Sequence, residues 1–419
     1  MLRTNADMRR LFIAQVISYL GDWFSFVALV GLVDDLTNSS FLVSMIVVSF
    51  SLPSFVASPI AGVIVDRFDR RRILIGVSLV QSVAALGLVL VGADTIWLAF
   101  VCQSIISGLA AIVKPASEAG TPNLARNHEE LGKAQALFGS TWGVMLAVGA
   151  ALGGFFAAVL GRDAAFIINA VSFVLSAGLI FRISRPLQEE RHAVRDRMRP
   201  VADMREALGH ARRDPVLLSL LLSKTTFAIG SGVVSQLAVL ASDVYGGGDG
   251  ARGVLIAARG AGVGLGPIVA TRFTGDDVGK VLTVCGYASL AFSVFYLTGA
   301  WMPALWLCVI FITAAHLGGG AQWTLSTYGL QMRSPDQIRG RILAGDFALM
   351  TLVLSLTSLA AGALSEATSV RTAISAFAAA AAVASLVYIS ATRSLRTQLL
   401  RRSEPGPGDR SPSSAPSGS

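Results

Sequence analysis

Two ionisable residues, Asp22 and Lys224, lie inside long apolar stretches of the chain. Asp22 is about 17 Å from Leu11 along a helix, which places it near the middle of a membrane. An ionisable group at that depth costs at least about 2.5–3.5 kcal/mol, so it normally faces a cavity or a partner. Because burial penalises the charged carboxylate, Asp22 is a candidate for reversible proton binding. The alternative is a packing residue that is hydrogen-bonded to Trp or Ser.

A short charged segment between two apolar runs is the second candidate for function. From Gly62 to Arg72 it reads Gly-Val-Ile-Val-Asp-Arg-Phe-Asp-Arg-Arg-Arg, with six charges in the seven residues that start at Asp66. Such a segment cannot enter hydrocarbon and must form a tight loop at a membrane surface. Gly62 lies one helical turn before Asp66 on the same face, so a neighbouring helix can approach closely there.

The segments that carry these residues are long enough to cross a membrane. The chain is 53% hydrophobic and 14% charged, with a mean hydropathy of +0.64, whereas soluble domains carry about 25% charged residues. Windows of about 20 apolar residues predict an all-α integral membrane protein with twelve transmembrane helices. The predicted spans are 11–33, 41–64, 73–92, 95–117, 133–160, 164–184, 216–242, 252–272, 281–300, 303–328, 342–365 and 370–392.

Basic residues alternate from loop to loop, which predicts the orientation of the chain. Of the 34 Lys and Arg, 29 fall on the side of both termini, and the loops of the other side hold only Arg162, Arg252 and Arg371. Basic loops face the cytoplasm. We therefore expect a multi-pass protein of the inner (plasma) membrane with cytoplasmic termini. Anionic membrane lipid is the expected partner of the net charge of +8, and nucleic-acid binding is not expected.

One long loop divides the spans into two sets of six. We expect four parts, namely an N-terminal half, a cytoplasmic linker, a C-terminal half and a partly disordered cytoplasmic tail, at 1–184, 185–214, 215–392 and 393–419. Gly132-Lys133 and Gly340-Arg341 each enter the fifth span of a half. This echo is typical of duplicated, pseudo-symmetric six-helix halves.

The sequence lacks the patterns of an enzyme, a nucleotide site or a metal site. Gly275 to Lys280 misses the phosphate-loop spacing, and Val281 follows where Ser or Thr is required. His128-Glu129-Glu130 lacks the second histidine of a zinc helix. Without a nucleophile–base pattern, we expect no enzyme activity and no cofactor. A non-transporting receptor is the alternative from a different class.

Twelve spans in two halves, together with the 62–72 segment, resemble the major facilitator superfamily. Its signature is Gly-x-x-x-Asp-Arg-x-Gly-Arg-Arg, and Asp69 replaces the second glycine here. With Gly21-Asp22-Trp23-Phe24, this variant resembles the macrolide-efflux and enterobactin-exporter-like branch. The resemblance implies a secondary active transporter that exports amphipathic small molecules, such as drugs, antibiotics or siderophores, in exchange for protons. It would be a multidrug-type antiporter and a monomer. The alternatives within the fold are an importer and a lysolipid transporter.

The resemblance also implies that the charged segment is a gating latch. In the superfamily it braces the second span against the eleventh when the transporter faces outward. Asp66 would meet the helix N-terminus near Gly340, where anions are favoured, and Arg67 and Arg70 would pair with Asp346. The simpler alternative is that the charges only anchor the loop at the surface.

Other residues gain expected roles from the same resemblance. The first and seventh spans line the central cavity of the superfamily, so Asp22 and Lys224 would form a breakable pair that takes part in proton coupling. Further cavity candidates are Gln103, Arg259 and His316, although a lone His in an apolar helix is more often a packing residue.

A glycine-rich stretch in the fifth predicted span resembles the exporter pattern Gly-Pro-x-x-Gly-Gly, with Ala150 where proline is expected. Gly149 and Gly153 are one helical turn apart and allow close helix contact, as does Gly154. Packing alone explains these glycines equally well.

Overall fold

The computed structural model of this protein describes residues 1–188, 209–275 and 277–403. In this part of the chain every regular element is a helix, and twelve helical segments are long and apolar enough to cross a membrane. The prediction of an all-α membrane protein with twelve spans is confirmed. Much of the predicted linker and tail falls on residues 189–208 and 404–419, which lie outside the described residues.

The first six spans are continuous helices joined by short connections. They are α1 (Ala6–Thr37), α2 (Ser40–Arg67), α3 (Arg70–Gly87), α4 (Trp97–Leu124), α5 (His128–Leu160) and α6 (Arg162–Phe181). Short 3-10 turns, η1 (Leu88–Leu90) and η2 (Ala93–Thr95), connect α3 to α4.

The last six spans begin with an interrupted helix. This span consists of α8 (Pro215–Ser231), the 3-10 turn η3 (Gly232–Gln236) and α9 (Leu237–Asp243). The helices that follow are α10 (Asp249–Thr274), α11 (Val278–Gly299), α12 (Leu305–Arg333), α13 (Asp336–Ala367) and α14 (Val370–Ala391). A final helix, α15 (Arg393–Ser403), continues beyond α14 and carries basic residues and leucines.

Local sequence explains where the helices around the charged segment begin. Asp69 is the N-cap of α3, and its carboxylate accepts a hydrogen bond from the backbone N–H of Arg72 at 2.8 Å. Aspartate is a strong N-cap and glycine a weaker one. The residue that departs from the superfamily signature therefore starts the third span.

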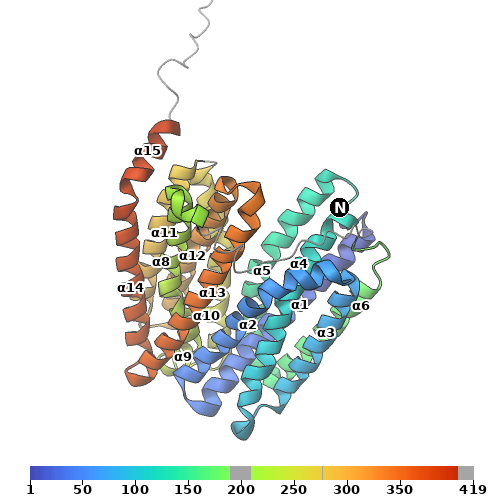
Figure 1. The fold of residues 1–419 in the computed structure, drawn as a ribbon. Helices are drawn as coiled ribbons and strands as arrows, with labels where there is room; N and C mark the ends of the chain where they lie inside the picture. The colour runs from blue at the N-terminus through green and yellow to red at the C-terminus, as the bar shows by residue number, and fades with distance from the viewer. Residues whose placement is uncertain (189–208, 276, 404–419) are drawn as a thin grey trace, which may run out of the picture.

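The two sets of six helices form two bundles that lie side by side (Figure 1). Within the first, α1 packs on α6 and α2 on α4, and within the second, α12 packs on α10 and α11. Between them the main contacts are α5 with α10 and α2 with α13. The ribbons diverge toward the end that holds the N-terminus and α15, which we name the terminal end (Figure 1). The end that holds Thr37 and Ser40 is the opposite end.

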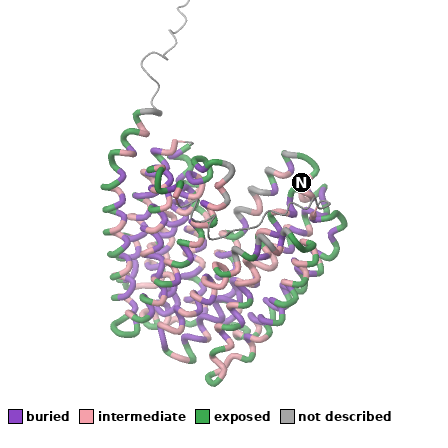
Figure 2. Tube along the Cα trace, viewed as in Figure 1, coloured by how far each residue is buried: buried purple, intermediate pink, exposed green. Residues whose placement is uncertain are grey.

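Small residues let the two halves touch from mid-helix to the opposite end. A Cβ placed on Gly154 of α5 would lie 2.7 Å from Cα of Gly253 in α10, which a side chain cannot tolerate. Hydroxyls join α2 to α13, with Ser51 Oγ 2.8 Å from Ser355 Oγ. Buried residues accordingly run along the junction of the bundles (Figure 2). Close backbone approach between small residues is typical of membrane helix contacts.

Candidate functional site

A cavity inside the first half surrounds Asp22, near the middle of α1. Its lining comes from five helices and consists of Tyr19, Asp22, Trp23, Phe50, Ser54, Gln103, Ile106, Ser107, Ala110, Trp142 and Asn169. The cavity volume is about 80 Å³. A pocket for a drug-sized ligand measures about 300–1,000 Å³, so in this conformation the space suits a few waters. A larger molecule requires the helices to move apart.

Asp22 carries a carboxylate oxygen that the fold leaves unpaired. Oδ1 is buried and accepts no hydrogen bond of normal geometry within the described residues, and the Asn169 amide on the same cavity is the side-chain donor near this carboxylate. A charged oxygen without a well-placed protein donor is costly, and water in the cavity, a proton or a cation would lower that cost. The arrangement suits a group that binds and releases positive charge.

Lys224 and Asp346 form a buried ion pair within the second half. The Lys224 ammonium contacts the Asp346 carboxylate, and the two side chains are only 4% and 5% exposed. Lys224 also donates to Thr327 Oγ1 at 2.8 Å and lies 4.7 Å from the ring centroid of Trp323. The ammonium therefore joins α8 to α12 and α13. In this conformation Lys224 pairs with Asp346 of α13, which packs beside α8, and does not pair with Asp22 of the first half.

The arginines of the charged segment contact their own half. Arg70 donates to the carbonyls of Ala119 at 2.8 Å and Leu187 at 3.1 Å, and Arg67 is exposed. Their expected partner Asp346 is occupied by Lys224. The expected pairing is therefore absent from this conformation, in which α2 and α13 meet nearer the opposite end. Gly62, Asp66 and Gly340 lie in α2 and α13, and beyond this backbone assignment they fall outside the described part.

The predicted packing glycines all lie where helices meet. Gly149 faces Trp23, and Gly153 faces the backbone of Phe24, both on α1. Gly154 faces Gly253 on the other half. The stretch therefore places α5 against α1 and α10 at once.

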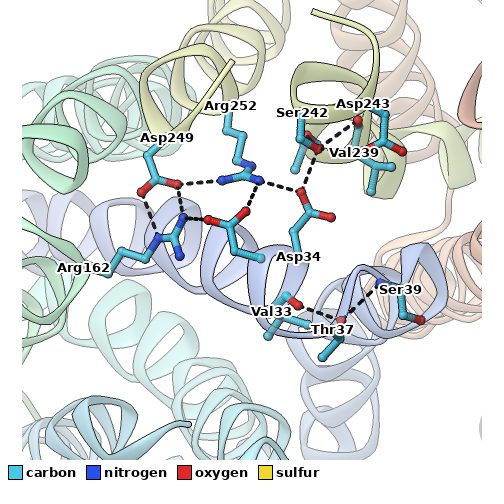
Figure 3. Close-up of polar contacts among 12 residues, drawn as sticks. Val33, Asp34, Thr37, Ser39, Arg162, Val239, Ser242, Asp243, Asp249 and Arg252 are labelled. Carbon is cyan, nitrogen blue, oxygen red and sulfur yellow. Dashed lines mark hydrogen bonds and ion pairs between the residues drawn. The ribbon is translucent and has the colours of Figure 1, made fainter. Parts of the chain in front are cut away.

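An ion cluster at the opposite end bridges the two halves, and sequence reasoning missed it. We name it the interhalf cluster; it consists of Asp34, Asp35, Arg162, Asp249 and Arg252 (Figure 3). Arg252 of α10 contacts Asp34 and Asp35 of α1, each at 2.6 Å, and its side chain is 2% exposed. Arg252 also contacts Asp249 at 3.0 Å.

The interhalf cluster also includes a residue of α6, so this helix contacts both α1 and α10 there. Arg162, the first residue of α6, contacts Asp249 at 2.8 Å and also contacts Asp35. Ser242 of α9 donates to Asp34 at 2.8 Å. Three carboxylates and two guanidinium groups are thus shared between the halves. The first half alone would keep the Arg162–Asp35 pair and one unpaired carboxylate, Asp34, whereas the second half would keep the Asp249–Arg252 pair. The cluster therefore favours the joined state.

The remaining cavity candidates lie in three different surroundings. Gln103 lines the Asp22 cavity. His316 is buried in the second half and shares a 2.8 Å hydrogen bond with the Tyr296 hydroxyl. Arg259 lines a second cavity, between the halves, and its guanidinium lies 5.9 Å from the ring centroid of Trp23. Asp22 lines the first cavity and Arg259 the second, and Trp23 lines both.

Comparisons with known proteins agree with this architecture. A family described as transmembrane secretion effector matches residues 2–404. The putative bacilysin exporter BacE of Bacillus subtilis is 25% identical over 365 residues, covering 86% of this chain and 89% of the relative. The uncharacterized MFS-type transporter YfiS of Bacillus subtilis (strain 168) is 28% identical over 225 residues, which is 53% of each chain.

Solved structures share the fold at low sequence identity. A bacterial homolog of the human lysosomal transporter Spinster, inward-facing and occupied, has a TM-score of 0.70 at 15% identity and covers 92% of this chain and 96% of its own. A peptide transporter of the POT family in complex with alafosfalin has a TM-score of 0.72 at 12% identity, with coverage of 94% and 95%. The family match spans nearly the whole chain, so this protein belongs to the transmembrane secretion effector family of major facilitator superfamily transporters and is not an enzyme.

Proposed function

We propose that this transporter is an exporter of amphipathic small molecules in the inner (plasma) membrane, that it works by alternating access, and that entry of protons drives it through Asp22. The observation that carries the proposal is the unpaired carboxylate oxygen of Asp22 on a mid-membrane cavity. A group at this depth that alternates between charged and neutral forms can link proton movement to the movement of helices.

Basic residues on the terminal end support a cytoplasmic position for both termini. With that orientation, the conformation described above is closed to the outside and faces the cytoplasm. The interhalf cluster and the glycine contacts of α5 with α10 would form the outer gate. Substrate would enter between the halves from the cytoplasmic side.

The return step requires the outer gate to open and the terminal end to close. Opening would separate Arg252 from Asp34 and expose both groups to water, which offsets the lost ion pair. Closing would bring the 62–72 segment of α2 toward the start of α13, where the latch inferred from the superfamily would act. A proton taken up by Asp22 from outside would be released to the cytoplasm as new substrate binds.

Export, as opposed to import, is supported by the names of the matched proteins, a secretion effector family and a putative exporter. Inside-out membrane vesicles test the direction. Vesicles that contain the protein should accumulate fluorescent amphipathic dyes or antibiotics when their lumen is acidic, and a protonophore should abolish the accumulation. Loss of preloaded dye under the same gradient would indicate import, and indifference to the gradient would refute proton coupling.

A further inference from the structure

Arg259 is a cation that the membrane interior of this protein leaves without a counterion. Within the described residues no carboxylate lies within ion-pair distance of its guanidinium, it makes no hydrogen bond, and its buried Nε has no partner. Arginine stays charged in proteins. Arg259 is partly buried, and a charge inside the membrane without a counterion is costly. Such a residue is a candidate for ligand binding.

The other buried cations of the spans show the contrast. Lys224 has Asp346, and Arg252, two turns before Arg259 on α10, has three carboxylates. Arg259 faces Trp23, with 5.9 Å between its guanidinium carbon and the ring centroid, and has the uncharged Tyr296 nearby. A cation–π contact of this kind contributes about 0.5–2 kcal/mol, less than the cost of burying the charge.

Apart from Arg259 and Ser235, the cavity beside Arg259 is lined by apolar residues, and it lies between the two halves. Its lining is Trp23, Phe26, Val30, Val47, Phe50, Val234, Ser235, Ala238, Ile256, Arg259 and Leu354. Arg259 is the one charged residue among them. Helices α1 and α2 supply one wall, and η3, α9, α10 and α13 supply the other. A ligand here would contact both halves, which is where an alternating-access transporter must hold its cargo.

We propose that Arg259 binds an anionic group of the transported molecule, with a carboxylate as the favoured class, while the aromatic and aliphatic lining takes up an adjoining apolar group. This inference rests on the proposed export function and defines its substrate class as amphipathic carboxylates. The planar guanidinium presents paired donors that match a carboxylate. The ligand would therefore supply the counterion that the fold lacks.

Trp23 and Phe50 line this cavity and also the Asp22 cavity. The two cavities measure about 50 and 80 Å³, so a molecule that places its carboxylate on Arg259 would extend toward Asp22 only after the helices move apart. Ligand binding at Arg259 would therefore affect the surroundings of Asp22, because the same two aromatic side chains contact both cavities.

Thermal unfolding of the purified protein, without any proton gradient, tests this site. The probes are aromatic carboxylates, such as N-acetylated aromatic amino acids and dipeptides, together with their neutral carboxamides. Carboxylates should raise the melting temperature and the matched amides should not. Arg259→Gln should weaken carboxylate binding by about tenfold or more. Arg272→Gln, which removes an exposed arginine from the same helix, should bind as wild type does.

The ligand-free melting temperature separates binding from a structural role. Because Arg259→Gln removes a partly buried charge that has no counterion, the unliganded variant should melt at the wild-type temperature or above it. A lower melting temperature, or equal stabilisation of wild type by acids and amides, would overturn the proposal. So would native mass spectrometry that shows a co-purified anionic lipid which Arg259→Gln removes. Failure of dye export would leave these binding results unchanged, so the two proposals fail separately.

Discussion

Arg252 of α10 contacts Asp34 of α1 at 2.6 Å, and this ion pair joins two halves of the transporter from positions 218 residues apart in the chain. Both side chains are buried. Because the pair lies at the opposite end, it must break whenever the halves separate there. Opening of the halves at this end therefore requires the ion pairs of the interhalf cluster to break, which costs electrostatic free energy.

Arg252→Gln should shift the equilibrium toward opening at the opposite end. Removal of one partner of a buried ion pair costs about 3–5 kcal/mol, and the cost falls on the closed state. A reporter cysteine at Ser44, which contacts Ser235 across the junction, should react with an impermeant maleimide at least about tenfold faster. Arg371→Gln is the control, because Arg371 lies at the same end and donates to Ala300 within its own half. Unchanged labelling in Arg252→Gln would exclude a gating role for the cluster.

Lys224 and Asp346 should behave as a structural pair in this conformation. Either Lys224→Met or Asp346→Leu leaves one buried charge unpaired, and each should lower the melting temperature strongly. The double variant should regain most of the loss, since both charges are then gone. A double-mutant cycle by thermal unfolding measures the coupling. Additive losses in the double variant would show that the two charges do not depend on each other.

Gly154→Val should keep the two halves from meeting. A Cβ at this position would lie 2.7 Å from Cα of Gly253 and 2.6 Å from the carbonyl oxygen of Asp249, and these backbone atoms cannot rotate away. Transport should fall to near background while the protein still reaches the membrane. Gly178→Val is the matched control, because a Cβ there has open space around it. Wild-type transport by Gly154→Val would mean that α5 and α10 need not approach this closely.

Asp69→Ala should destabilise the start of α3 by about 1 kcal/mol, and Asp69→Asn should be close to neutral, because alanine removes the N-cap acceptor and asparagine keeps one. The wild-type acceptor is 2.8 Å from the Arg72 N–H. Asp69→Gly, which restores the residue of the superfamily signature, should cost a few tenths of a kcal/mol. Thermal unfolding compares the three variants. Equal losses for alanine and asparagine would show that the cap contributes nothing.

Local patterns account for the part of this structure that could be predicted. Hydropathy and the distribution of basic residues predicted all twelve spans, and the depth of Asp22 followed from its place in the first of them. The helical spacing of Gly149 and Gly153 predicted close contact without showing that α1 would supply it. These features depend on residues near one another in the chain.

The pairings between distant residues could not be predicted, for physical reasons. Asp346 seemed free for Arg67 or Arg70, but the side-by-side packing of α8 and α13 places Lys224 against it. Arg162 and Arg252 were interpreted only as loop charges. Two signals were present, adjacent aspartates at 34 and 35 near the end of a span and the Asp249–Arg252 spacing of a helical pair. Neither shows which helices meet.

The central claim is that Asp22 couples proton movement to export, and substrate-driven proton flux in proteoliposomes tests it most directly. A pH-sensitive fluorophore inside the proteoliposomes measures the lumenal pH. The change in pH is followed after addition of a substrate that the wild type transports. The wild type should show proton flux that depends on substrate, and Asp94→Asn, which alters an exposed carboxylate, should match it. Asp22→Asn should still exchange labelled for unlabelled substrate but move no protons. Substrate-driven proton flux in Asp22→Asn equal to that of the wild type would contradict the account.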